Sequence, residues 1–139
     1  MAEDDRARVR ARVEQFFAAF GTGPGLDERL DGLTAAFLPE ATIAHFTPAG
    51  ELVVDDVSGF IEPRRAFLAS GAVTEFREWP LSGELWVHGN LAMWSGPYAM
   101  QGLGQDGPLS GRGAKVIQLV RLDGVWRIGS VAWEDEPAS

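Results

Sequence analysis

The end of the chain holds the pattern that most constrains the fold. Residues 111–122 and 125–133 are two mainly apolar stretches, and Asp123-Gly124 lies between them. An Asp-Gly pair tolerates the positive φ angles of a type I′ turn, which joins two antiparallel strands through two residues. The pattern therefore predicts a long terminal hairpin. Pairing outward from the turn places four pairs on one face of the sheet: Leu122 with Val125, Val120 with Arg127, Gln118 with Gly129, and Val116 with Val131.

Three helices are expected before the main sheet. Apolar residues recur at helical spacing in residues 9–20, which is typical of a helix that packs one face on a core. A second helix is predicted over 27–37, with Asp27 as its cap, and a third over 63–70, with Pro63 in its first turn.

Short strands are expected over residues 41–46 and 52–54, and longer ones over 73–88 and 91–100. The glycine-rich stretch 102–113 is predicted to be a mobile loop. The element order indicates an α+β protein, with helices on one face of a curved antiparallel sheet.

Composition narrows the class of protein. A chain of 139 residues suits a single domain spanning 1–139, with about 6–134 ordered. The net charge of −8 argues against nucleic-acid binding, and no apolar run approaches the ~20 residues that span a membrane. The chain has no cysteine, and His45 and His88 lack metal-binding spacing, so we expect no metal or other cofactor. The first residues do not resemble a signal peptide, and a cytoplasmic location is expected.

The two faces of the terminal hairpin are both apolar. An antiparallel sheet with one face in water alternates more cleanly, so both faces are expected to be covered. A second copy of the chain is the simplest cover, and we predict a homodimer. The face assigned to that interface carries Ile117, Leu119, Trp126 and Ile128.

Several short segments, in this order along the chain, resemble one superfamily. They are Ala18-Ala19-Phe20, Ala41-Thr42-Ile43, the turn after His88, and Trp126-Arg127-Ile128. The chain resembles the nuclear transport factor 2-like superfamily over nearly its whole length, and is most similar to a branch whose members have no assigned function. The superfamily includes ketosteroid isomerases, scytalone dehydratase and SnoaL-like polyketide cyclases. The resemblance implies a cystatin-like, cone-shaped sheet, with the helices on its concave face and a pocket open at one end.

The resemblance also suggests site residues. His45 matches the general base of the isomerases, and Gln118 matches their oxyanion donor, whereas Phe16 replaces a tyrosine that donates a hydrogen bond. Each has a structural alternative: His45 bonded to a carbonyl or facing solvent, and Gln118 bonded to a neighbouring strand or to water. If the two residues act together, their side chains should lie roughly 4 to 10 Å apart. The pocket is expected to be lined by Phe16, Phe20, Trp94, Val116, Gly129, Val131 and Trp133.

Two functions are compatible with these features. One is the binding of a small, mostly apolar organic molecule, with cofactor-independent proton transfer, isomerisation, dehydration or cyclisation. The other is a non-catalytic ligand-binding or dimerisation module. Lys115 lies on the opposite strand face from Gln118 and is expected to serve a surface or an interface rather than form a Schiff base.

Overall fold

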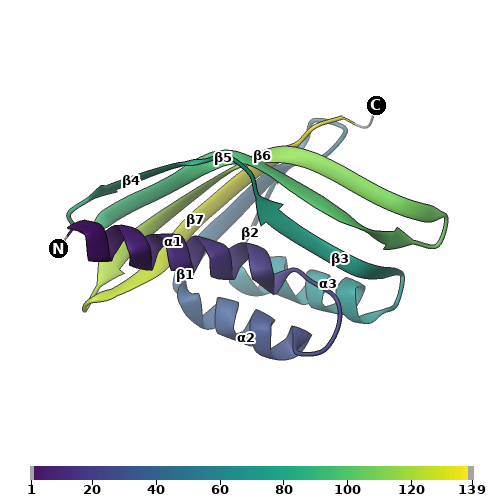
Figure 1. Cartoon of the computed structure of the whole chain (residues 1–139), viewed down its shortest axis with the longest axis horizontal. Helices are drawn as coiled ribbons and strands as arrows, with labels where there is room; N and C mark the ends of the chain where they lie inside the picture. Colours follow the sequence, from purple (N-terminus) through teal and green to yellow (C-terminus); the bar gives the residue numbers. More distant parts are fainter. Residues whose placement is uncertain (1, 138–139) are drawn as a thin grey trace.

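Three helices lie on one side of a bent sheet in the computed structural model, which describes residues 2–137 (Figure 1). They are α1 (Ala2–Ala19), α2 (Leu26–Ala36) and α3 (Val57–Ala69). None of the helices in this described part is long and apolar enough to cross a membrane. The strands are β1 (Phe37–Phe46), β2 (Leu52–Asp55), β3 (Val73–Pro80), β4 (Glu84–His88), β5 (Leu91–Gly104), β6 (Gly107–Leu122) and β7 (Val125–Asp135).

The seven strands form one sheet in the order β2-β1-β7-β6-β5-β3, and β4 pairs with β5 beside β3. All pairs are antiparallel except β1 with β7, which is parallel. The predicted α+β class, with helices on one face of a curved sheet, is confirmed. The parallel pair was not expected, and it joins the first strand of the chain to the last.

The helices begin where local chemistry favours them. The apolar stripe of α1 is buried as predicted. Gly25, with φ 85°, precedes α2, so Asp27 lies in the first turn instead of capping it. Asp56 caps α3 by accepting a hydrogen bond from the backbone N–H of Gly59 at 2.7 Å. This helix therefore begins six residues before Pro63, because burial of its apolar stripe outweighs the hydrogen bond that the internal proline lacks.

The predicted mobile loop over 102–113 is wrong. These residues extend β5 and β6 into one long hairpin with its turn at Gln105-Asp106. Gly102 shows why this stretch contains glycine: a Cβ there would lie 3.0 Å from the Val73 side chain and 3.2 Å from the backbone of Phe76. The glycine permits close approach of β3 rather than mobility.

The terminal hairpin has the predicted turn but a different register. Asp123 and Gly124 have φ angles of 53° and 78°, as a type I′ turn requires. Beyond the turn, Gly129 forms a bulge, so Gln118 pairs with Ser130 and Ile117 with Val131. The predicted pairs of Gln118 with Gly129 and of Val116 with Val131 are therefore wrong.

The hairpin face assigned to a dimer interface is the core of the protein itself. Ile117, Leu119, Trp126 and Ile128 are each at most 2% exposed in the single chain. They belong to the core between the sheet and the helices, and Arg12 of α1 donates a hydrogen bond to the Trp126 carbonyl at 3.0 Å. These four side chains cannot also form an interface, and that assignment is wrong. Dimerisation itself stays a prediction.

Candidate functional site

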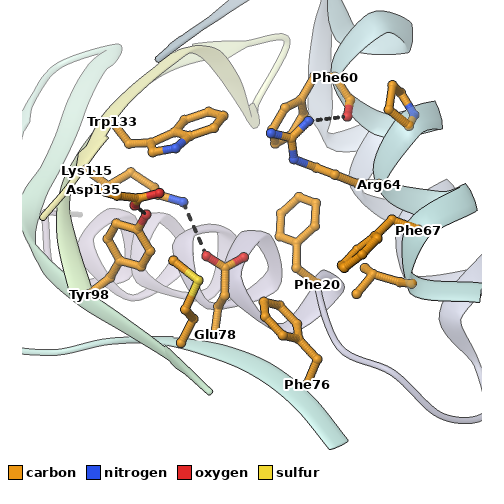
Figure 2. A pocket seen from close by; sticks show the side chains of 13 residues that line it. Phe20, Phe60, Arg64, Phe67, Phe76, Glu78, Tyr98, Lys115, Trp133 and Asp135 are labelled. Atoms are coloured by element: carbon orange, nitrogen blue, oxygen red, sulfur yellow. Dashed lines mark hydrogen bonds and ion pairs between the residues drawn. The ribbon is translucent and has the colours of Figure 1, made fainter. Parts of the chain in front are cut away.

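A cavity of about 310 Å³ opens between α3 and the concave face of the sheet. Most of its wall is apolar and largely aromatic. Charged and phenolic groups come from four strands and from α3, and Figure 2 shows them around one hollow. The apolar lining includes Phe20, Phe60, Phe67, Phe76, Met100 and Trp133, and the polar lining consists of Arg64, Glu78, Tyr98, Lys115 and Asp135.

Strand register brings the polar groups together. Along each strand, residues that face the cavity alternate with residues that face away from it. The four strands that carry the polar groups lie next to one another in the sheet, in the order β7-β6-β5-β3. Glu78 of β3 lies beside Met100 of β5, and Lys115 of β6 lies beside Trp133 of β7. Residues far apart in the sequence thus meet on one concave surface.

Lys115 and Glu78 form a buried ion pair at the cavity wall. Their Nζ and Oε1 atoms are 3.8 Å apart, and the side chains are 4% and 13% exposed. Burial lowers the pKa of Lys115, although the carboxylates of Glu78 and Asp135 oppose this. Burial also raises the pKa of Glu78, against the opposing effect of Lys115. The two shifts bring the pKa values of the amine and the carboxyl closer together, which lowers the free-energy cost of moving a proton from Lys115 to Glu78.

Tyr98 reaches Asp135 across a glycine. Gly113 of β6 pairs with Tyr98 on one side and with Asp135 on the other, and the Tyr98 hydroxyl donates a hydrogen bond to Asp135. A Cβ at Gly113 would lie 2.9 Å from the Tyr98 ring and 2.9 Å from the Asp135 carboxylate. Burial, followed by the interaction with Asp135, raises the pKa of Tyr98. The missing side chain therefore makes this contact possible.

We expect Gly113→Val to destabilise the protein by about 1–3 kcal/mol, because its side chain must displace the Glu134 backbone carbonyl, 2.6 Å from the Cβ position, as well as Tyr98 and Asp135. Urea unfolding measures this cost. Ala114→Val is the matched control, since Ala114 is the exposed neighbour on the same strand and gains a β-branched residue. Equal stability of the two variants would contradict the close packing at Gly113.

Arg64 brings a second cation from α3. Its guanidinium lies 4.3 Å from the centre of the Phe60 ring and 5.3 Å from that of Trp133, and it donates a hydrogen bond to the Phe60 carbonyl at 2.9 Å. Burial lowers its pKa, and the acidic groups of the cavity oppose the shift. An arginine remains charged in proteins. With their usual charges, the two cations Arg64 and Lys115 face the two carboxylates Glu78 and Asp135.

The structure places the predicted pocket residues in three different environments. Phe20 and Trp133 line the cavity. Phe16, Trp94 and Val131 are buried in the core, 0 to 4% exposed, and do not line it. Val116 is 38% exposed on the opposite sheet face, and Gly129 forms the bulge in β7.

His45 and Gln118 do not share the cavity. The His45 ring stacks on Trp133 with centroids 4.6 Å apart, and its buried Nδ1 has no hydrogen-bond partner among the described residues. Gln118 is exposed on the other face of the sheet, where its Oε1 accepts a hydrogen bond from Ser130 at 2.7 Å. The sheet itself separates the Gln118 side chain from the cavity face, so one small ligand cannot touch both residues. The structure thus gives no support to this catalytic pair.

Sequence reasoning missed most of the polar lining. It placed Lys115 correctly on the face opposite Gln118 but assigned that face to a surface or an interface, whereas Lys115 is 4% exposed inside the cavity. One signal was available: Lys115 alternates with Ile117 and Leu119, both fully or almost fully buried. A lone cation in such a series indicates a buried polar site.

Comparison with known proteins identifies the fold. No protein-family model matches the sequence, and no curated protein matches it significantly. A provisionally assigned dehydratase of the nuclear transport factor 2-like family from Streptomyces avermitilis has a TM-score of 0.75 and 11% identity, covering 99% of this chain and 100% of that one.

Two structures from Novosphingobium aromaticivorans are also similar. One is a nuclear transport factor 2-like protein with a cystatin-like fold, with a TM-score of 0.73, 16% identity, and coverage of 99% of this chain and 86% of that one. The other is a provisionally assigned aromatic ring hydroxylase, with a TM-score of 0.69, 14% identity, and coverage of 98% and 92%. The protein therefore has the nuclear transport factor 2-like, cystatin-like fold.

Proposed function

We propose that the protein binds a small, mostly apolar organic molecule in the cavity and catalyses cofactor-independent proton transfer on it, with Glu78 as the base. The observation that carries this proposal is a buried carboxyl beside a buried amine, both lining an otherwise apolar cavity.

The cavity suits a small ligand with one polar end. Its volume of about 310 Å³ lies in the range of small-molecule sites, and aromatic side chains form much of its apolar wall. The polar groups gather where β3, β5, β6 and β7 meet. A molecule with an apolar body and one oxygen function would place the oxygen among these groups and the body against the rings.

Glu78 suits the removal of a proton from carbon. Burial raises its pKa, so its carboxylate is a stronger base than an exposed one. Lys115, 3.8 Å away, lies where it would stabilise negative charge that develops on a nearby substrate oxygen. Removal of a proton next to a carbonyl begins both isomerisation and dehydration. The dehydratase assignment of one structural neighbour agrees with this reaction class.

The first test measures binding. The probe is 4-phenylbutan-2-one, which has an aromatic body and one carbonyl, together with its alcohol analogue, 4-phenylbutan-2-ol. A ligand at 100 times its Kd should stabilise the protein by about 2.7 kcal/mol, seen as a rise in melting temperature. Met100→Trp, which places a large side chain in the cavity, should abolish the rise.

Met93→Trp is the matched control for this test. Met93 is on the same strand as Met100 but pairs with Gln118 and lines a different hollow on the opposite face. Its replacement should leave the ligand-induced shift intact. A shift that survives Met100→Trp, or no shift with either probe, would contradict the proposed binding site. Binding without proton transfer would instead favour the non-catalytic binding module.

A further inference from the structure

We propose that Lys115 forms a covalent Schiff base with an aldehyde or ketone carbonyl of the ligand. The inference rests on the proposed function because it uses the same cavity, and it names the class of substrate. It replaces the surface or interface role that the sequence suggested for Lys115.

The choice of lysine at this position favours amine chemistry. Arginine supplies eleven of the twelve lysine and arginine residues of the chain, and Lys115 is the single lysine. Arginine is better suited to structural ion pairs, as at Arg65, which bonds to Asp27 and Asp31 at 2.8 Å each. A guanidinium does not deprotonate in proteins, whereas an amine can become a nucleophile. The chain thus places its one side-chain primary amine at the cavity.

Aromatic rings enclose the amine. Lys115 Nζ lies 4.2 to 5.1 Å from the ring centres of Tyr98, Phe16, Trp133 and Phe17. Its distance of 3.8 Å to Glu78 Oε1 is longer than a hydrogen bond. Figure 2 shows this amine and the Glu78 carboxylate pointing toward one another at the hollow. These rings attract an ammonium through cation–π contacts but exclude the water that would solvate it, and this loss of water is the main cause of the lowered pKa of Lys115.

Glu78 completes the proton balance. The ammonium transfers one proton to the Glu78 carboxylate, and the neutral Nζ attacks the carbonyl carbon, forming a C–N bond while the carbonyl electron pair moves to oxygen. Glu78 carries two protons, one after the other, from Nζ to the former carbonyl oxygen. That oxygen then leaves as water. The remaining C=N bond carries one hydrogen and one positive charge. Carbonyl and ammonium therefore become iminium and water with no other reactant, and Glu78, again a carboxylate, is ready to remove a proton from the adjacent carbon.

Reductive trapping tests the proposal directly. The full chain is incubated with 4-phenylbutan-2-one and sodium cyanoborohydride, which reduces an iminium to a stable amine. We expect one adduct by intact mass, located at Lys115 by peptide mapping, with a rate that saturates as the ketone concentration rises. An excess of 4-phenylbutan-2-ol should suppress it, because the alcohol occupies the cavity without forming an iminium.

Two variants serve as controls. Lys115→Arg keeps the positive charge but cannot form the adduct. Arg112→Lys introduces a lysine at an exposed position of the same strand, and the adduct at Lys115 should still form at least about tenfold faster than at that new lysine. Equal labelling of both lysines, or labelling confined to the terminal α-amine, would overturn the proposal. Because these comparisons are made within chains that retain Lys115, they hold even if Lys115→Arg fails to fold.

The outcomes also separate this inference from the proposed function. If ketone and alcohol stabilise the protein equally and no adduct forms at Lys115, the site binds ligand but the Schiff base is wrong. If neither probe binds and no adduct forms, both proposals fail.

Discussion

Replacing Glu78 with glutamine is expected to slow the exchange of the α hydrogens of 4-phenylbutan-2-one for deuterium by about 100- to 10,000-fold. The amide has nearly the same shape as the carboxyl but cannot accept the proton. Proton NMR in deuterium oxide measures the exchange. Glu134→Gln is the matched control, because Glu134 is an exposed carboxylate on β7 and should not affect the rate.

The pH profile gives an independent readout of the base. Exchange needs the Glu78 carboxylate, so its rate should rise with pH through the pKa of this group. Burial raises that pKa above the usual 4.5, with a further rise from Asp135 and opposition from Lys115 and Arg64. The acid limb should therefore lie above pH 4.5 and disappear in Glu78→Gln. An unchanged rate in that variant would eliminate Glu78 as the base and direct attention to Asp135.

The second large effect concerns stability. Replacing Glu78 by leucine and Lys115 by methionine together should leave the protein equally stable or up to about 4 kcal/mol more stable, because apolar groups avoid the desolvation of the ion pair. Glu78→Leu alone should cost up to about 3–5 kcal/mol, because it leaves the ammonium among aromatic rings without its nearest ion-pair partner. Urea unfolding of the two variants and the wild type measures both effects.

The advantage of the double variant should depend on pH. The pKa of Lys115 is lower in the folded protein than its usual 10.5. Between the folded-state pKa and 10.5, the unfolded chain binds more protons than the folded protein, so the stability of the wild type rises as pH increases toward 10.5. The pKa of Glu78 is higher than its usual 4.5 in the folded protein, so wild-type stability falls as pH rises just above 4.5. The advantage should thus be largest between these limits. A double variant less stable than the wild type at neutral pH would show that the pair mainly serves stability.

Local patterns predicted the architecture well. The helical stripe of α1, the Asp123-Gly124 turn and the turn after His88 all depend on neighbours in sequence, and the structure confirms each of them. The bulge at Gly129 depends instead on how β7 fits against β6 and the core. One extra residue exchanges the faces beyond it, which moved Val131 into the core and invalidated the predicted pairs.

The site was less predictable because polarity alone does not identify the concave face. Gln118 is polar and exposed, whereas Lys115 is charged and buried. Tyr98 and Asp135 are 37 positions apart in sequence, and only the sheet order brings them together across Gly113. The family resemblance suggested positions for a base and a donor, but the polar groups of this cavity come from other residues.

The parallel pairing of β1 with β7 affects how the protein folds while it is being synthesised. Ile43 of β1 pairs with Val131 of β7, and Ile43 is synthesised 88 residues before Val131. Of the two strands that flank β1 in the folded sheet, β2 is made at once, whereas β7 is made last, so one edge of β1 lacks its folded-state partner until then. Closure of such a long loop is slow, which lengthens the exposure of the nascent sheet. The same late strand carries Trp133 and Asp135, so the cavity and the protection of that edge are completed in one step.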